Sequence, residues 1–237
     1  MKIAFIIVTF HTPKTLITRL KSEIIKLAAA DSKVYMVDNT NNNKGYAAGV
    51  NSGLKSAIKD GRNIFIVANP DISFGRLEKQ DLTAGGKHFD VWGLAMKQRN
   101  KTYYGGEIDK WRLSGGLITK KPTKRFRNVD YVSGSLMLFT KKVINKIGYW
   151  DKKYFMYYED VDFCYRAWKA GLKVGIDSKF AYLHYEVSKK TPEKQRYLRQ
   201  SRWLFFQKYS NIGQKLREFI RMPKTILEEV FGKNSAK

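Results

Sequence analysis

Three short apolar segments, each ending at polar residues, constrain the fold of this chain more than any other feature. They cover residues 3–8, 34–37 and 63–68 and are rich in β-branched and aromatic residues. The stretches between them, 16–27 and 48–59, are typical of helices, with apolar residues recurring at helical spacing in the first. Buried strands that alternate with helices are typical of strand–helix–strand units in a parallel sheet. The sequence therefore predicts an α/β fold.

The second half of the chain is less regular. Residues 97–127 hold ten Lys or Arg against two acids and two Gly-Gly pairs, which indicates loops and short antiparallel strands. We then expect, in order, a buried strand over 129–139, a helix over 141–147, a helix over 159–170 ending at Gly171, and a strand over 172–176. From Glu193 onward the sequence predicts helices broken by Gly213 and Pro223.

Charge and cysteine content narrow the possible partners. The 45 Lys and Arg outnumber the 21 Asp and Glu, so the net charge of +24 indicates a polyanionic surface or substrate. A single cysteine, Cys164, excludes an internal disulfide framework and a cysteine zinc site. The longest uncharged stretch, 3–13, is far shorter than the ~18 apolar residues of a membrane span and lacks a signal-peptide cleavage site. We therefore expect a cytoplasmic protein.

Polar residues stand at the ends of all three predicted strands. They are Thr9, the pair Asp38-Asn39, and Asn69 with Asp71. A single aspartate at such a place is as readily a turn or a helix cap. Parallel sheets, however, bind ligands at the carboxyl ends of their strands, so the three ends together predict one polar pocket.

Glycines after the second strand restrict the kind of ligand. The segment 43–53 is neither a dinucleotide fingerprint nor a phosphate-binding P-loop, because neither glycine spacing is present. Its small residues, at 45, 47, 48, 49 and 53, still let a backbone approach a ligand closely.

The densest polar cluster is acidic. Glu159, Asp160 and Asp162 lie within four residues of one another, among aromatic side chains. Like charges raise each other's pKa, although a helix N-terminus offsets part of this cost. One interpretation is an acidic helix start in which Arg166 pairs with Asp162 at i, i+4. The other is a functional site, favoured because the chain has so few acids.

A series of short motifs along the chain resembles, in identity and order, the inverting family 2 glycosyltransferases. Within that family the motifs are most similar to the rhamnosyltransferase-like branch of bacterial surface-polysaccharide synthesis. The resemblance covers residues 1 to about 187. Its motifs are IAFIIVT (3–9), VDN (37–39), N-x-G…G-x-N-x-G (43–53), ANPD (68–71), GSLM (134–137), GYWD (148–151), FMYYEDVD (155–162) with Arg166 and Gly171, and His184.

The resemblance implies a GT-A fold, with a Rossmann-like, mixed, mostly parallel sheet flanked by helices and a C-terminal helical tail. It divides the chain into a catalytic domain (1–190) and a basic amphipathic helical tail (191–237). Within the catalytic domain, 1–96 is the half that binds the nucleotide-sugar and 97–190 the half that binds the acceptor.

The same resemblance implies a role for individual residues. Asp38 hydrogen-bonds the pyrimidine base of the donor, and the full set of donor contacts is Thr9, Asp38, Asn39, Gly45, Asn51, Asn69 and Asp71. A divalent Mg²⁺ or Mn²⁺ cofactor is held by Asp71 and His184, although the first acid of the family's D-x-D element is Asn69 here and His184 is as readily structural. Asp160 is the general base. Contacts to the acceptor or sugar come from Trp150, Asp151 and Glu159.

The predicted reaction is inverting, metal-dependent hexosyl transfer. Rhamnose or a similar hexose moves from a dTDP- or UDP-sugar to a hydroxyl of a glycan acceptor, lipid-linked, in cell-surface polysaccharide synthesis. A carboxylate can take the hydroxyl proton, and a divalent ion stabilises the leaving diphosphate. Two alternatives are a basic nucleic-acid-binding protein, for which no known motif is present, and a sugar-nucleotide pyrophosphorylase, whose Gly-rich loop is missing from residues 9–13.

The basic C-terminal stretch allows two interpretations. Residues 193–224 carry nine Lys or Arg against two Glu, with aromatic and aliphatic residues between them. The stretch is either a pair of helices packed on the catalytic domain or a surface for anionic lipids. We predict peripheral binding at the inner face of the cell membrane, and no nucleic-acid partner.

Overall fold

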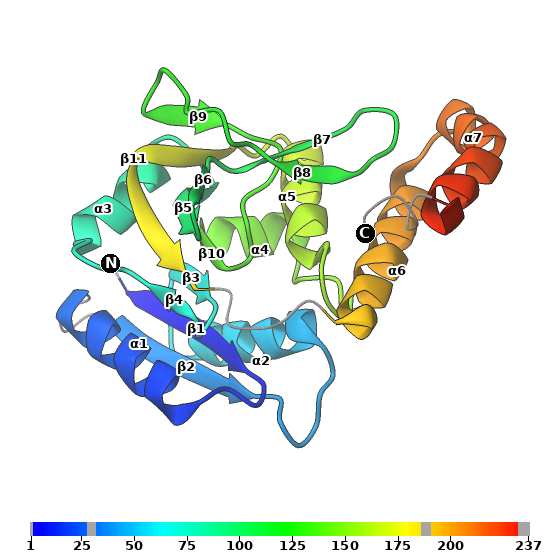
Figure 1. Ribbon diagram of the computed structural model, residues 1–237. Helices are drawn as coiled ribbons and strands as arrows, with labels where there is room; N and C mark the ends of the chain where they lie inside the picture. The colour runs from blue at the N-terminus through cyan, green and yellow to red at the C-terminus, as the bar shows by residue number, and fades with distance from the viewer. Residues whose placement is uncertain (1, 28–31, 186–190, 232–237) are drawn as a thin grey trace.

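The computed structural model describes the backbone of residues 2–27, 32–185 and 191–231, and side chains as far as residue 221. A central sheet runs through the molecule (Figure 1). Its main strands lie in the order β2-β1-β3-β10-β5-β11-β4, with β6 beside β5 and β9 beside β11. Their bounds are β1 Ile3–Thr9, β2 Ser32–Asp38, β3 Ile64–Ala68, β4 Ile72–Ser73, β5 Val91–Gln98, β6 Lys101–Tyr103, β9 Phe126–Asn128, β10 Leu136–Thr140 and β11 Val174–His184.

The sheet is mixed and mostly parallel. β1 pairs in parallel with β2 and β3, and β5 pairs in parallel with β11. β10 lies between β3 and β5 and is antiparallel to both, so it keeps those two strands parallel to each other. The predicted fold class is confirmed, and the carboxyl ends of β1, β2 and β3 share one edge of the sheet.

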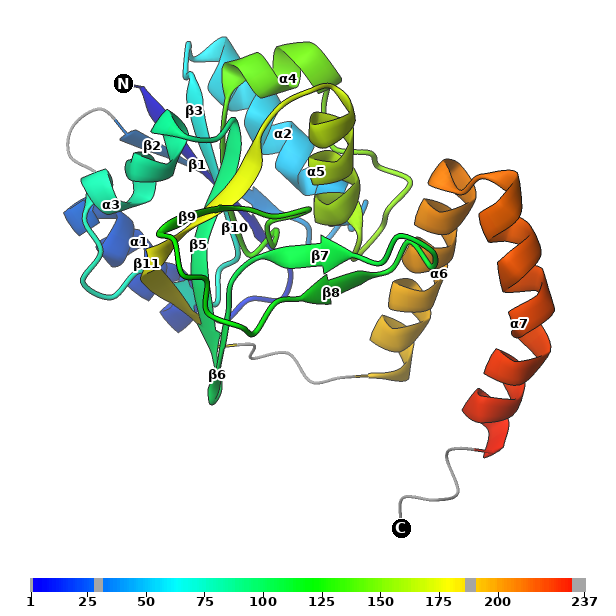
Figure 2. The ribbon, with the colours of Figure 1, turned by 90° about the horizontal axis from the view of Figure 1, so that it is seen from above.

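Helices cover both faces of the sheet (Figure 2). Alternate residues of β1 point to opposite faces, so Ile3, Phe5 and Ile7 join one hydrophobic cluster and Ala4, Ile6 and Val8 the other. The first cluster includes residues of α1 (Lys14–Leu27) and α3 (Lys79–Thr83), which the short helix η1 (Ala84–Lys87) follows. The second includes residues of α2 (Tyr46–Lys59), α4 (Lys141–Ile147) and α5 (Glu159–Lys169).

Two strands differ from their predictions. The strand expected over 129–139 begins only at Leu136, because 133–135 form a turn in which the Leu136 N–H donates to the Ser133 carbonyl at 3.2 Å. The strand expected over 172–176 extends to His184. It does so because pairing with β5 resumes beyond a register shift between Asp177 and Ala181. The buried Asp177 is tolerated there because Arg125 pairs with its carboxylate at 2.7 Å.

The basic middle of the chain forms short antiparallel strands, as predicted. β7 (Gly106–Ile108) and β8 (Gly115–Leu117) pair as a separate hairpin. β6 pairs antiparallel with β5, and β9 with β11, so this region extends the sheet at its edge.

The helices of the C-terminal part break at a different place from the one predicted. α6 (Pro192–Tyr209) and α7 (Ile212–Phe231) are separated at Ser210 and Asn211, and α7 passes through both Gly213 and Pro223. The break coincides with a reciprocal cap. The Gln214 N–H donates to Asn211 Oδ1 at 2.9 Å, and the Asn211 N–H donates to Gln214 Oε1 at 2.7 Å. Gly213 lies in the first turn, where helix N–H groups have no intrahelical partner in any case.

α6 packs against the body of the protein. Its Phe205 and Phe206 are buried in the same hydrophobic cluster as α2 and α5. Ser201 is also buried, and its hydroxyl donates to the Met156 carbonyl at 2.8 Å. The boundary between a catalytic domain (1–190) and a tail (191–237) stays a prediction.

Candidate active site

The ends of β1 and β2 hold Asp38 in one orientation. Asp38 lies beside Thr9 in the parallel register, and its Oδ1 accepts hydrogen bonds from the Thr9 hydroxyl (3.3 Å), the Thr40 hydroxyl (2.6 Å) and the Thr40 N–H (3.0 Å). The bonds from Thr40, more than any other interaction, lower the pKa of this exposed carboxyl. Asp38 is therefore an ionised acceptor, suited to an N–H group of a bound base.

The loop after β2 is attached to the segment that leads into α5. The Asn39 N–H donates to the Thr9 carbonyl at 2.8 Å, and its side-chain amide donates to the Gly45 carbonyl at 3.1 Å. Gly45 has a φ of +88°, and a Cβ at this position would lie 2.6 Å from the Phe155 carbonyl oxygen. Only glycine fits this contact, so Gly45 is what lets the two segments meet.

A turn over 133–135 connects the strand ends to one another. The Asn69 N–H donates to the Ser135 carbonyl at 3.0 Å, and the Ser135 and Tyr182 hydroxyls lie 2.6 Å apart. The Tyr46 hydroxyl donates to the Gly134 carbonyl at 3.0 Å. Sequence reasoning missed this turn because it assigned the residues to a buried strand, although Ser-Gly-Ser is a turn signal.

The same turn holds the predicted base. Asp160 lies in the first turn of α5, and its Oδ2 accepts from the Gly134 N–H at 2.8 Å, while its Oδ1 accepts from the Val161 N–H at the same distance. Burial raises the pKa of Asp160, although these backbone hydrogen bonds oppose the shift. A carboxyl of this kind binds a proton more readily than an ordinary aspartate, as a general base requires.

Strained backbone precedes Asp160. Tyr157 and Tyr158 both have left-handed φ values, +69° and +65°, which non-glycine residues rarely adopt. Tyr158 is fixed from two sides: its hydroxyl accepts from the Gly115 N–H at 3.1 Å, and its ring packs on Phe205 of α6. The hairpin β7–β8 and α6 therefore hold the backbone that aims Asp160.

The two other acids of the cluster have different surroundings. Glu159 is 6% exposed and its Oε2 has no hydrogen-bond partner among the described residues. Burial, followed by the neighbouring Asp160 charge, raises the pKa of Glu159 well above its usual range.

Asp162 is fully buried and is paired on both sides. It accepts from Arg166 Nε at 2.8 Å, Lys208 Nζ at 2.7 Å and the Tyr209 hydroxyl at 2.7 Å. The i, i+4 pairing considered for Arg166 is present. Asp162 is a structural anion that joins α5 to α6, and these partners leave it unsuited to act as a base.

Three predicted contact residues, Asn51, Trp150 and Asp151, are bonded to or packed against other parts of the protein. Both polar atoms of the Asn51 amide are bonded to the Trp150 backbone, at 2.8 and 3.0 Å, which argues against a direct contact with a donor. Trp150 is 2% exposed and stacks on Phe163, so it supports the site from beneath. Asp151 forms an ion pair with Lys208 at 2.8 Å.

Asp71 and His184 are brought together by strand pairing. His184, the last residue of β11, pairs with Ile72 of β4, and its Nε2 lies 3.4 Å from Asp71 Oδ1. Its Nδ1 is buried and lacks a hydrogen-bond partner in the described part of the chain. The carboxylate oxygen and the Nε2 atom that face each other are both possible ligands of one divalent cation. Among the described residues no group of three or more His, Cys, Asp or Glu is placed to hold a metal.

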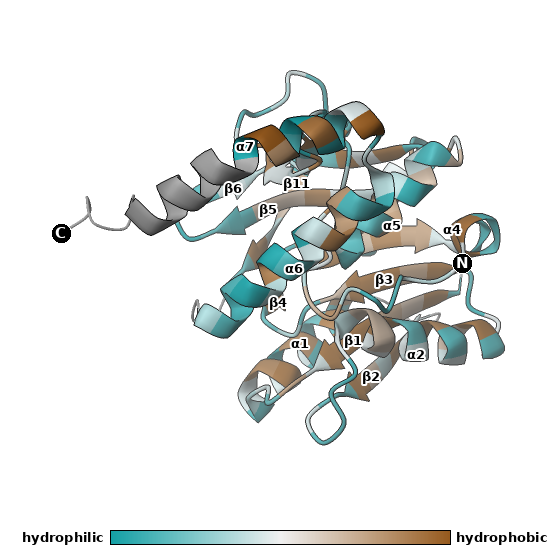
Figure 3. Cartoon of the chain, turned by 90° about the vertical axis from the view of Figure 1, so that its right-hand side faces the viewer, coloured by the Kyte–Doolittle hydropathy of each residue, from teal (hydrophilic) through white to brown (hydrophobic). Residues whose placement is uncertain are grey.

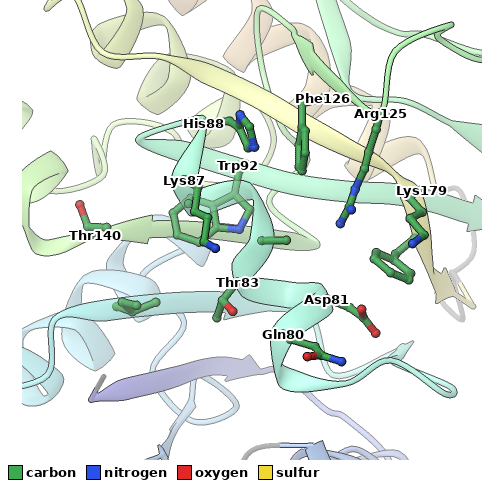
Figure 4. A pocket seen from close by; sticks show the side chains of 14 residues that line it. Gln80, Asp81, Thr83, Lys87, His88, Trp92, Arg125, Phe126, Thr140 and Lys179 are labelled. Carbon is green, nitrogen blue, oxygen red and sulfur yellow. The ribbon is translucent and has the colours of Figure 1, made fainter.

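A pocket of about 690 Å³ lies at the opposite edge of the sheet (Figure 4). Ile64 at the start of β3 and Thr140 at the end of the antiparallel β10 both line it, which identifies this edge as the amino ends of the parallel strands. Basic and aromatic side chains such as Lys87, His88 and Phe126 surround it, and the residues lining it include none of the predicted site residues. The prediction that the chemistry lies at the carboxyl ends of the strands concerns the other edge.

Comparisons with known proteins give the family and fold that this chain resembles. Residues 120–226 match the family model described as glycosyl transferase family group 2. The chain is 27% identical over 143 residues to the low-salt glycan biosynthesis hexosyltransferase Agl10 of Haloferax volcanii, a match that covers 56% of this chain and 46% of the relative.

Two solved structures share the fold. A crystal structure of GalNAc-T7 with UDP, GalNAc and Mn²⁺ has a TM-score of 0.64 at 12% identity, covering 87% of this chain and 47% of that one. The crystal structure of A197 from STIV has a TM-score of 0.54 at 13% identity, covering 78% and 86%. The chain thus spans about half the length of Agl10 and of the GalNAc-T7 chain.

The architecture is a GT-A-like fold, a class of glycosyltransferase folds built on a mixed, mostly parallel sheet flanked by helices. The family match and the curated relative show similarity to family 2 glycosyltransferases over part of the chain.

Proposed function

We propose that this protein transfers a hexose from a nucleoside diphosphate sugar to a hydroxyl of a glycan acceptor. The observation that carries the proposal is the turn over 133–135. Its backbone binds Asn69 at the strand-end edge and also the Asp160 carboxylate. The expected donor edge and the expected base are thereby parts of one hydrogen-bonded unit. The family match favours transfer over the nucleic-acid-binding and pyrophosphorylase alternatives.

Different site residues serve the donor, the acceptor and the leaving group in an inverting displacement. Asp38, held by Thr9 and Thr40, accepts from the donor base, and the loop around Asn39 and Gly45 lets the backbone approach the nucleotide. Asp160 takes the proton of the acceptor hydroxyl as that oxygen attacks the anomeric carbon. Only one carboxylate is needed, unlike in glycoside hydrolysis. Asp71 and His184 would hold a Mg²⁺ or Mn²⁺ ion, which when bound stabilises the departing diphosphate.

The test of the donor site is thermal unfolding with a panel of nucleoside diphosphates. A matching ligand at ~100 times its Kd should stabilise the protein by about 2.7 kcal/mol in the presence of Mn²⁺. Chelation should remove the gain and abolish transfer, and Asp71→Ala should weaken the stabilisation because it removes the carboxylate ligand. Asp109→Ala, an acid of the β7–β8 hairpin, serves as the control and should respond as the wild type does. Full transfer in excess chelator would contradict the roles of Asp71 and His184.

The pH dependence of transfer should report Asp160. Because burial raises the pKa of Asp160, its carboxyl ionises only at a pH above the range in which an ordinary aspartate titrates. We therefore expect kcat/KM to fall as the pH drops through this raised pKa, well before an exposed carboxyl would titrate. Initial rates over pH 4–9 measure the effect. In Asp160→Asn the residual rate should lose this acidic limb, and an unchanged limb would assign it to another group.

The finer parts of the proposal concern donor, acceptor and location. Rhamnose or a similar hexose, carried by dTDP or UDP, follows from the resemblance to the rhamnosyltransferase-like branch. A lipid-linked acceptor and a position at the inner face of the membrane are supported by the net charge of +24. No helix in the described residues has the length and apolarity to cross a membrane.

A further inference from the structure

One face of α7 is apolar and uncovered. Ile212, Leu216, Phe219 and Ile220 are 78%, 60%, 73% and 76% exposed. At about 100° per residue these positions fall on one stripe of the helix. Figure 3 shows apolar residues along the start of α7, and in Figures 1 and 2 the helix lies at the margin of the molecule, away from the sheet.

The opposite, polar face attaches α7 to the body. The Gln214 side-chain amide donates to the Lys110 carbonyl at 2.7 Å, and the Arg217 guanidinium lies 5.0 Å from the centre of the Trp111 ring. By helical geometry, positions 214 and 217 lie across the helix from position 212. The attachment to the β7–β8 hairpin therefore turns the apolar stripe outward.

An exposed apolar stripe of this kind marks a contact with another molecule, and the charge around the stripe indicates which kind of molecule covers it. Residues 193–224 hold nine Lys or Arg and two Glu, and Lys215 is exposed beside the stripe. A second copy of the chain would bring two strongly cationic surfaces together, which is unfavourable. An anionic bilayer instead complements both the charge and the apolar face.

We propose that α7 lies in the surface of an anionic bilayer, with its apolar stripe among the acyl chains and its basic residues at the headgroups. This goes beyond the proposed transfer reaction, which gives the contact a purpose through a membrane-confined acceptor but supplies none of the observations. Within the basic stretch 193–224 it assigns the contact to α7 and not to α6, because Lys208 of α6 is engaged by Asp151 and Asp162.

The experiment is sedimentation with vesicles of phosphatidylcholine alone or mixed equally with phosphatidylglycerol. The wild type should bind the mixed vesicles at low salt and keep part of this binding in 1 M NaCl, where charge interactions are screened beyond about 3 Å. Phe219→Gln/Ile220→Gln should lower partitioning by at least ~10-fold, because two apolar side chains leave the acyl region. Ile25→Gln/Trp168→Gln, which changes two comparably exposed residues of α1 and α5, should stay within about twofold of the wild type.

Each outcome separates this proposal from the transfer reaction. Both double variants should have the thermal midpoint of the wild type and the same stabilisation by nucleoside diphosphates. This result establishes that the variants fold. Absence of binding to the mixed vesicles, complete release by salt, or unchanged binding of the α7 variant would overturn the proposal. So would a wild-type dimer that the α7 substitutions convert to a monomer in light scattering, because a second copy would then cover the stripe.

Discussion

Replacing Asp160 with asparagine should lower turnover by about 10²–10⁴ while donor binding survives. The amide keeps the shape of the carboxyl, and its oxygen can still accept from the Gly134 N–H, but it cannot take a proton from the acceptor. Initial rates of nucleoside diphosphate release measure the first effect, and thermal stabilisation by the diphosphate measures the second.

A matched control is available at the other edge of the sheet. Asp90 also accepts a backbone N–H, from Lys173 at 2.9 Å, and precedes β5 far from the strand ends. Asp90→Asn should leave turnover within a few-fold of the wild type. Near-normal turnover of the Asp160 variant would transfer the role of base to Glu159, because the three partners of Asp162 argue against that residue.

Asp162→Ala should destabilise the protein by about 3–5 kcal/mol, the usual effect of breaking a buried ion pair. The carboxylate is fully buried, and its removal leaves Arg166, Lys208 and the Tyr209 hydroxyl without their shared acceptor. The polar link between α5 and α6 is lost with it, while the aromatic contacts of Tyr165 with Phe205 and Tyr209 stay. Urea unfolding should show the effect as a lower midpoint.

Asp60 provides the comparison, because it too binds a lysine, Lys33, and a tyrosine hydroxyl, that of Tyr35. Its side chain is 35% exposed, however, so Asp60→Ala should lower the urea midpoint far less than Asp162→Ala does, because exposed ion pairs contribute little to stability. Equal losses in the two variants would contradict the structural role assigned to burial at Asp162.

The candidate site was predictable where its residues follow regular elements. Thr9, Asp38 and Asn69 each come directly after a short apolar run, and the ends of such runs meet at one edge of a parallel sheet. The part that could not be predicted is the turn over 133–135. It resembled a continuation of the strand that follows, and its contacts with Asn69 and Asp160 join residues far apart in the sequence.

Apolar periodicity alone determined the layered α/β architecture, because strand and helix patterns are local and burial acts on each segment in the same way. The sequence also predicted the helix over 141–147, and the Gly-Gly pairs and basic residues of 97–127 predicted its short antiparallel strands. These features need no knowledge of which segment lies beside which.

Only the tertiary structure decided which polar groups are free to act. Asn51 and Trp150 bind each other, and Asp162 binds two cations, so these three polar or aromatic residues hold elements of the fold together. Likewise β11 extends to His184 only because β5 and β4 lie alongside it. The physical reason is the same in each case. Whether a polar side chain can act, or how far a strand extends, depends on partners that lie close in space. Those partners are too distant along the chain for any local sequence pattern to reveal them.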